Sequence, residues 1–136
     1  MPLTPSLRAT VFATFALFMT LVPISADAGQ RRDGVPVGHQ KNPETWYVLA
    51  EALSKQAKDS TLTPAAARAL VLRSLEVNEQ ALTLNPDYYE ALNLKAGLLR
   101  QRAPSEKDPS VRKKLIAEAD VVSRRAAEIA KRREKL

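Results

Sequence analysis

The feature that most restricts the fold is an internal repeat, because the second half of the chain repeats the apolar pattern of the first. Residues 64–84 recur at 109–129 with a shift of 45 residues, and residues 46–53 recur at 92–99 with a shift of 46. The matched pairs are Pro64 with Pro109, Leu70 with Leu115, Val71 with Ile116, Val77 with Val122, Ala81 with Ala126, Leu84 with Ile129, Trp46 with Leu92, Ala50 with Ala96 and Leu53 with Leu99. Self-similarity at such a period is typical of stacked helical repeats. The unit is therefore one pair of helices that occurs twice.

Four short motifs mark where the helices begin. A small polar residue precedes a proline in Asn42-Pro43, Thr63-Pro64, Asn85-Pro86 and Asp108-Pro109. The polar side chain can accept a hydrogen bond from the backbone at the helix start, where proline loses nothing by lacking an N–H. With apolar residues recurring every three or four positions, these motifs predict helices over about 43–57, 64–84, 86–102 and 109–134.

The composition agrees with an all-α fold. Apolar residues make up 45% of the chain but aromatic residues only 5%, and cysteine is absent. Alanine and leucine surrounded by charged residues form helices more readily than strands. Because the connections are short, successive helices are expected to pack antiparallel. We predict a helical-hairpin repeat of two antiparallel helix pairs, which forms a short α-solenoid or four-helix array over residues 42–134, with one repeat at 42–84 and the next at 85–131.

The first 28 residues are predicted to be a secretory signal peptide. An apolar run of 12 residues, Val11–Val22, follows Arg8 and ends before Pro23. Ala26 and Ala28 then supply the small residues at which a signal peptidase cleaves, so we expect export to the periplasm or the extracellular space after cleavage following Ala28. An uncleaved anchor or a buried helix is the alternative for this run. Residues 29–41 contain three glycines and are expected to be a flexible linker.

The helical region resembles the tetratricopeptide repeat family. Trp46, Leu49, Ala50 and Leu53 have the spacing of the first half of that repeat, and residues 81–88 (ALTLNPDY) resemble the end of its second half. Residues 90–99 open another copy, and the whole resemblance covers residues 42–131. It implies a bacterial exported protein with two elongated repeats.

The chain departs from the family pattern in length and at single positions. The usual period is about 34 residues, whereas here it is 45. Ser74 stands where a small alanine is preferred, and Asn78 and Ser123 stand where an aromatic residue is common. Lys95 occupies the position of Leu49 in the first copy. Only two copies are visible, although three or more usually bury a continuous core, so either the long second helices supply the missing contact or the chain docks on itself, for example as a homodimer.

The resemblance implies a scaffold or adaptor that binds a protein or peptide partner. The first helix of each pair usually lines the binding face of such arrays. The candidate partner-binding residues there are Tyr47 and Glu51 with Ser54 in the first copy, and Asn93, Gly97 and Arg100 in the second. Glycine in a helix costs about 1 kcal/mol relative to alanine, so Gly97 indicates close approach of another backbone or tight helix packing. Tyr89 either packs at the edge of the hairpin or anchors an interface.

The basic C-terminus supports an alternative function. Residues 111–136 carry nine Lys or Arg and four Asp or Glu, a net charge of +5 within a chain of net charge +6. The alternative is a basic envelope-associated protein that contacts an anionic membrane or cell-wall polymer peripherally through this helix. Nucleic acid is disfavoured as a partner because no aromatic residue is interleaved with the charges. No nucleophile–base pair, metal-ligand cluster or phosphate-binding loop is apparent, so we expect neither catalysis nor a cofactor or metal.

Overall fold

The structure is a computed structural model that describes residues 34–136. Four α-helices follow one another: α1 (Pro43–Gln56), α2 (Pro64–Leu84), α3 (Tyr89–Arg102) and α4 (Pro109–Arg133). Two short 3-10 helices, η2 (Val37–His39) and η3 (Ala103–Ser105), precede α1 and α4 respectively, and no strand occurs within the described range. The all-α prediction is therefore confirmed. The predicted signal peptide, its cleavage after Ala28 and the first part of the linker lie outside the described residues.

Three of the four helices begin as the motifs predict. The side chains of Asn42, Thr63 and Asp108 accept hydrogen bonds from backbone N–H groups in the first turns of α1, α2 and α4, and a proline stands at each helix start. These bonds satisfy amides that have no partner inside the helix. Each cap is typically worth about 1 kcal/mol, so the starts are fixed by local sequence.

The third helix begins three residues later than predicted. Asn85 caps nothing in α3, because its Oδ1 accepts a bond from the amide of Asp87 and its carbonyl accepts one from Tyr88. These two bonds close a turn over residues 85–88, so α3 begins at Tyr89, and Tyr88 provides no side-chain cap. The Asn-Pro motif therefore ends one hairpin and redirects the chain before the next.

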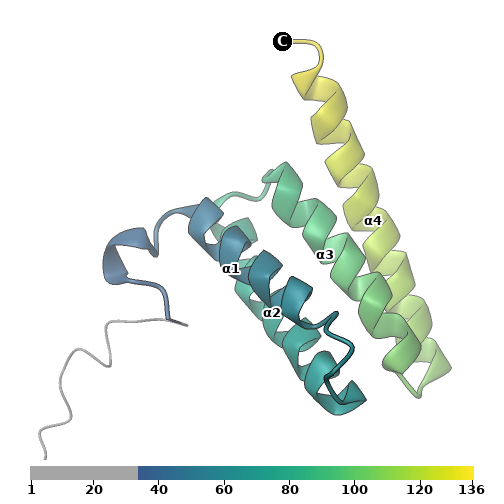
Figure 1. The fold of residues 1–136 in the computed structure, drawn as a ribbon. Coiled ribbons are helices and arrows are strands. Elements are labelled where there is room, and N and C mark those ends of the chain that lie inside the picture. The colour runs from purple at the N-terminus through teal and green to yellow at the C-terminus, as the bar shows by residue number, and fades with distance from the viewer. Residues whose placement is uncertain (1–33) are drawn as a thin grey trace, which may run out of the picture.

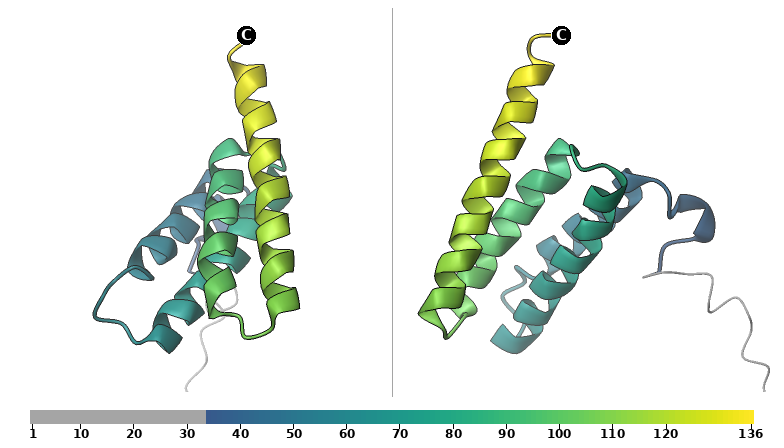
Figure 2. Two further views of the ribbon diagram at one scale, coloured as in Figure 1. Left: turned by 90° about the vertical axis from the view of Figure 1, so that its right-hand side faces the viewer. Right: turned by 180° about the vertical axis from the view of Figure 1, so that it is seen from behind.

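The helices form two antiparallel hairpins. α1 packs on α2, α3 packs on α4, and α2 packs on α3 to join the hairpins. In Figure 1, α1 and α3 run down the view whereas α2 and α4 run up it. The two further views in Figure 2 show the C-terminal end of α4 projecting beyond the rest of the array. None of the helices within residues 34–136 is both long and apolar enough to cross a membrane.

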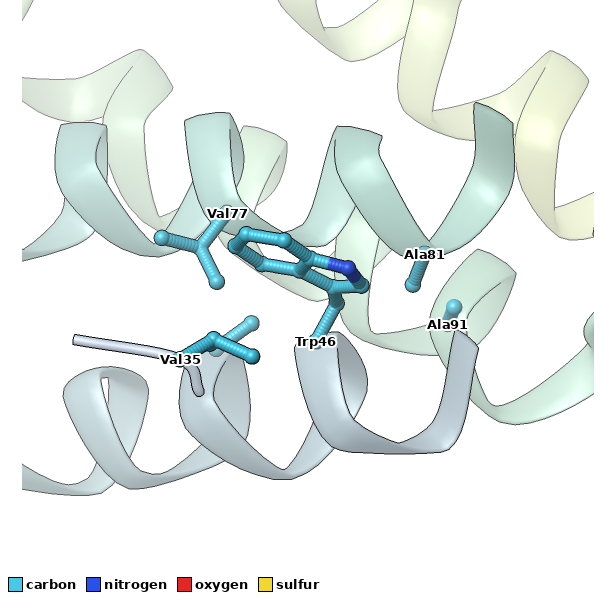
Figure 3. Packing of buried hydrophobic residues seen from close by; sticks show 6 residues of the cluster. Val35, Trp46, Val77, Ala81 and Ala91 are labelled. Atoms are coloured by element: carbon cyan, nitrogen blue, oxygen red, sulfur yellow. The ribbon is translucent and has the colours of Figure 1, made fainter. Parts of the chain in front are cut away.

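Trp46 is the largest buried side chain of the first hairpin. The indole reaches from α1 toward α2 and is surrounded by Val35, Val77, Ala81 and Ala91 (Figure 3). Only 2% of Trp46 is exposed, and its Nε1 donates a hydrogen bond to the carbonyl of Gln40 at 2.9 Å. Burying a side chain of this size stabilises a fold by on the order of 3 kcal/mol. The alanines around it leave the space that the indole fills.

The described part of the segment before α1 packs against the helices. Val35 is only 3% exposed and belongs to the Trp46 cluster. Gln40 fixes this segment from both sides, since its side chain donates to the carbonyl of Val35 and its own carbonyl accepts from Trp46. The sequence predicts a flexible linker over 29–41, whereas residues 34–41 are held by Val35 and by these hydrogen bonds. The glycines, proline and polar residues of this segment give no apolar periodicity, so the sequence did not reveal that contact.

Two buried polar residues of α2 hold the array together. Ser74 donates from Oγ to the carbonyl of Ala50 in α1 at 2.7 Å. Asn78 donates from Nδ2 to the carbonyl of Ala91 in α3 at 2.8 Å. Both side chains are fully buried. The two departures from the repeat pattern at these positions are therefore hydrogen-bonding groups, one within the first hairpin and one between the hairpins.

In the second hairpin, alanines lie opposite larger apolar residues. Leu99, Ala103, Leu115 and Ala119 form one buried cluster, and Leu92, Ala126 and Ile129 form another. Alanines facing leucine or isoleucine let α3 and α4 approach closely while the larger side chains fill the remaining space. The apolar stripe predicted for α4 is the one that faces α3.

Candidate protein-binding face

All six predicted partner-binding residues belong to the first helices of the two hairpins, and together they define the open face: Tyr47, Glu51, Tyr89, Asn93, Gly97 and Arg100. Asn93, Gly97 and Arg100 are exposed, and the other three are partly exposed. Tyr89, Asn93, Gly97 and Arg100 follow one another at helical spacing, so they share one side of α3. Ser54, a further candidate, is buried at 6% exposure and is excluded from this face.

A pair of tyrosines connects α1 to the start of α3 on this face. The rings of Tyr47 and Tyr88 meet edge to face with their centroids 5.4 Å apart. Glu90 lies close enough to both hydroxyls to influence their ionisation. Because Glu90 is one turn before Asn93, it continues the same side of α3. Tyr47 therefore lies next to the α3 half of the open face.

The electrostatic environment of the tyrosine pair is acidic. Burial raises the pKa of Tyr47, and the carboxylates of Glu51 and Glu90 raise it further. Burial likewise raises the pKa of Tyr88, followed by the effects of Glu90 and Glu44. Both hydroxyls are therefore protonated at neutral pH and can donate a hydrogen bond. The carboxylates at this end of the open face are paired, Glu51 with Lys55 and Glu90 with Arg133.

Gly97 leaves the backbone of α3 bare at the centre of the face. A Cβ placed on Gly97 would meet no atom within 4 Å, apart from its own neighbouring helix backbone. Tight helix packing within residues 34–136 is therefore wrong as an explanation for this glycine. No contact inside the described chain accounts for a residue that costs about 1 kcal/mol in a helix.

Arg100 closes the other end of the open face with an ion pair. Its Nη2 lies 3.0 Å from Oδ1 of Asp120 and 3.0 Å from Oγ of Ser123, both on α4. About half of each charged side chain remains exposed, so the pair is accessible to a partner. Sequence reasoning missed Asp120 and Ser123. They could have been found by applying the repeat shift, because Asp120 replaces Leu75 and Ser123 replaces Asn78 at equivalent positions.

Tyr89 forms the edge of the open face that borders α4. The guanidinium of Arg133 lies over its ring at 5.5 Å from the centroid. Arg133 also approaches Oε1 of Glu90 at 3.5 Å. Tyr89 is therefore a hairpin-edge residue whose ring is partly covered by a cation, and only part of the ring is available to a partner.

The basic helix α4 has two kinds of cation. Arg125 and Arg132 pair with Asp87 in the turn before α3 at 2.9 and 3.9 Å, and Arg133 pairs with Glu90 in the first turn of α3. Lys113, Arg124 and Lys131 have no ion pair within residues 34–136. Their spacing of 11 and 7 residues places them in one row along the helix. That row is one part of the basic stretch that is free to contact an anion.

Lys95 is held between three helices on the side of the array away from Gly97. Its Nζ lies 2.6 Å from Glu79 of α2 and 3.2 Å from Glu118 of α4. Burial by itself would lower the pKa of Lys95, but the hydrogen bonds and charges of Glu79 and Glu118 outweigh it and raise the pKa. Lys95 therefore replaces the apolar contact of Leu49 with an ionic bridge.

The chemistry available at the open face is recognition by contact. Residues 34–136 contain no group of three or more His, Asp or Glu side chains that could hold a metal ion. The open face offers two tyrosine hydroxyls, carboxylates, one amide and one guanidinium along a bare stretch of helix. Such groups can hydrogen-bond an extended peptide and pack against its side chains.

No known family model, curated protein or solved structure matches this chain.

Proposed function

We propose that the protein is an exported interaction module of the tetratricopeptide type, which binds a protein or peptide partner on the open face and catalyses no reaction. The observation that carries this proposal is Gly97, an exposed helical glycine at which an added Cβ would meet no neighbouring atom within residues 34–136. A helix keeps such a costly residue where a side chain would block something. A partner backbone lying across α3 is what a side chain at Gly97 would block.

The groups around Gly97 fit a partner with mixed polarity. Tyr47 lies at an aromatic end beside the exposed ion pairs Glu51–Lys55 and Glu90–Arg133. At the other end, Arg100 and Asp120 form a further exposed ion pair. Asn93 between the two ends can both donate and accept hydrogen bonds. An extended peptide with polar or charged residues near both ends would fit this face.

The test is a pull-down from the exported protein fraction with wild type and two matched variants. Gly97→Leu places a bulky side chain on the open face while favouring the helix. Ala69→Leu adds the same side chain at an exposed position of α2 and serves as the control. We expect a stoichiometric partner with wild type and A69L that is lost with G97L. Equal capture by all three proteins would refute binding on the open face.

The row of unpaired cations on α4 favours a second candidate function. Lys113, Arg124 and Lys131 could hold the protein on an anionic membrane or polymer, and each exposed cation contributes about 1 kcal/mol near such a surface. The triple variant K113Q/R124Q/K131Q should then lose sedimentation with anionic vesicles at low salt. The control K41Q/K58Q/K107Q removes three exposed charges outside α4. Similar retention of both variants on vesicles would rule out the row as the contact.

A further inference from the structure

The contact that joins the two hairpins has one half on α3 and the other on α2. An equivalent of each half lies at an outer surface of the array. Inside the molecule, Leu98 of α3 packs against Val71 and Ala57, with Leu94, Leu70 and Leu75 beside them. Leu98 is 1% exposed and Val71 is 4% exposed. This junction therefore consists of α3 leucines seated on an α2 surface.

The repeat shifts place an equivalent of each half at an outer surface. A shift of 46 residues relates Leu94 and Leu98 to Val48 and Ala52 on α1, and a shift of 45 relates Val71 to Ile116 on α4. Val48 is 53% exposed and Ile116 is 40% exposed, and Ala52 is exposed as well. Ile116 lies in an open recess of about 490 Å³ on α4, bordered by Pro109 and Ala117. Within residues 34–136, no hairpin precedes α1 and none follows α4.

The charges beside these two surfaces are of opposite sign. Glu44 and Glu51 lie one turn before and after Val48 on α1. Glu51 is paired with Lys55 at 3.2 Å, so Glu44 supplies the net negative charge beside Val48. Arg112 and Lys113 lie one turn before Ile116 on α4 and border its recess. Complementary charges fix the orientation of an apolar contact and disfavour other partners.

We propose that a second copy of this chain docks head to tail, with α1 of one molecule on α4 of the next, in the manner of the internal α3–α2 junction. A contact between two different surfaces does not close on itself unless the rotation permits a ring, so more than two copies can join. The contact also supplies the third hairpin that arrays of this kind usually need for a continuous core.

One substitution limits the strength of this contact. Asp120 stands at the position of Leu75, and its carboxylate is paired with Arg100. Ala52 is also smaller than its equivalent Leu98. The self-association is therefore reversible and concentration-dependent rather than permanent.

Analytical ultracentrifugation of the purified protein over a range of concentrations tests this proposal. We expect the weight-average mass to rise with concentration in wild type and to stay at the monomer value in I116D. The control V121D introduces the same charge at another exposed apolar position of α4 and should behave as wild type. D120L restores the apolar contact and should tighten association about tenfold, since burying a leucine is worth at least that factor.

Cysteine cross-linking supplies an independent readout, because the native chain has no cysteine. The A52C/I116C protein should form a ladder of disulfide-linked multimers under mild oxidation. The control A52C/E128C moves the second cysteine to another side of α4 and should give dimers at most. A wild type that remains monomeric throughout, association that survives in I116D, or equal ladders for both cysteine pairs would each overturn the proposal.

Discussion

One face of α2 packs on α3, and α4 has an equivalent face. The two faces share a sequence pattern but differ in what covers them. On α2 the sequence Val71, Leu75, Asn78 is covered by the second hairpin, and Val71 and Asn78 are buried. On α4 the equivalent residues are Ile116, Asp120 and Ser123, of which the first two are exposed. The hydrophobic first position is kept, while the second has become a charge.

This difference shows how one repeat pattern can form a buried junction on one helix and an exposed surface on another. A partly buried leucine next to a buried asparagine makes a junction, whereas an aspartate next to a serine makes a solvated surface. Arg100 pairs with both polar residues, and its own equivalent in the first hairpin is the buried Ser54. Terminal repeats generally need such a polar outer face for solubility.

The largest expected contrast between the two faces comes from introducing a charge at the shared apolar position. Val71→Asp should lower the free energy of unfolding by at least about 3 kcal/mol, since it buries an unpaired carboxylate. Ile116→Asp should change it by less than about 0.5 kcal/mol in the monomer, as surface changes usually do. Urea unfolding followed by circular dichroism at low protein concentration measures both. Similar losses in the two variants would mean that the α4 face is covered in solution.

A smaller contrast is expected at the shared polar position. Asn78→Ala removes the hydrogen bond to Ala91 and leaves a small cavity, which should cost about 1–2 kcal/mol. Ser123→Ala removes a partly exposed bond to Arg100 and should cost less than about 0.5 kcal/mol. Thermal unfolding of the two variants beside wild type provides the measurement. If S123A proved as harmful as N78A, the polar network on α4 would be a structural junction instead of a surface.

Gly97 in the second hairpin occupies the position of Glu51 in the first. Replacing Gly97 by alanine adds one methyl group and measures what the missing side chain costs the helix. Gly97→Ala should raise the free energy of unfolding by about 0.5–1 kcal/mol, because alanine favours the helix and the space around the new Cβ is empty. The chemical denaturation midpoint should therefore increase. A decrease would show that something lies against Gly97 in the free protein.

The smallest contrast in stability is between Lys95 in the second hairpin and the equivalent Leu49 in the first, and it depends on pH. The pKa of Lys95 is raised in the fold, so its contribution to stability is complete below the unfolded pKa of about 10.4 and is lost as the pH rises through the folded value. The contribution should be below about 1 kcal/mol because Glu79 and Glu118 are half exposed. Unfolding free energies should therefore fall more steeply above pH about 10 in wild type than in Lys95→Leu. Parallel pH profiles for wild type and Lys95→Leu would mean that the ion pairs of Lys95 with Glu79 and Glu118 do not stabilise the fold.

Much of the fold was predictable because local chemistry determines it. The capping residues Asn42, Thr63 and Asp108 fix three helix starts, and the apolar spacing fixes the buried stripe of α4. The start of α3 was not predictable from Asn85-Pro86, since a helix cap and an Asx turn use the same two residues. Local sequence could not distinguish a bond to the next amide from a bond to a helix terminus.

The candidate site was predictable in position but not in its contacts. The repeat spacing correctly brought Asn93, Gly97 and Arg100 to one exposed side of α3. It placed Ser54 there as well, although that residue is buried. The pairing of Arg100 with Asp120 and the covering of Tyr89 by Arg133 depend on where α4 crosses α3, which no single helix encodes.

The measurement that tests the proposed binding face most directly is NMR mapping of the isotope-labelled protein with the partner captured in the pull-down. The account predicts that amide signals shift at Tyr47, Asn93, Gly97 and Arg100, whereas signals of the α4 row at Lys113, Arg124 and Lys131 stay in place. Shifts confined to the α4 row, with Gly97 unchanged, would contradict it and would assign binding to the basic helix.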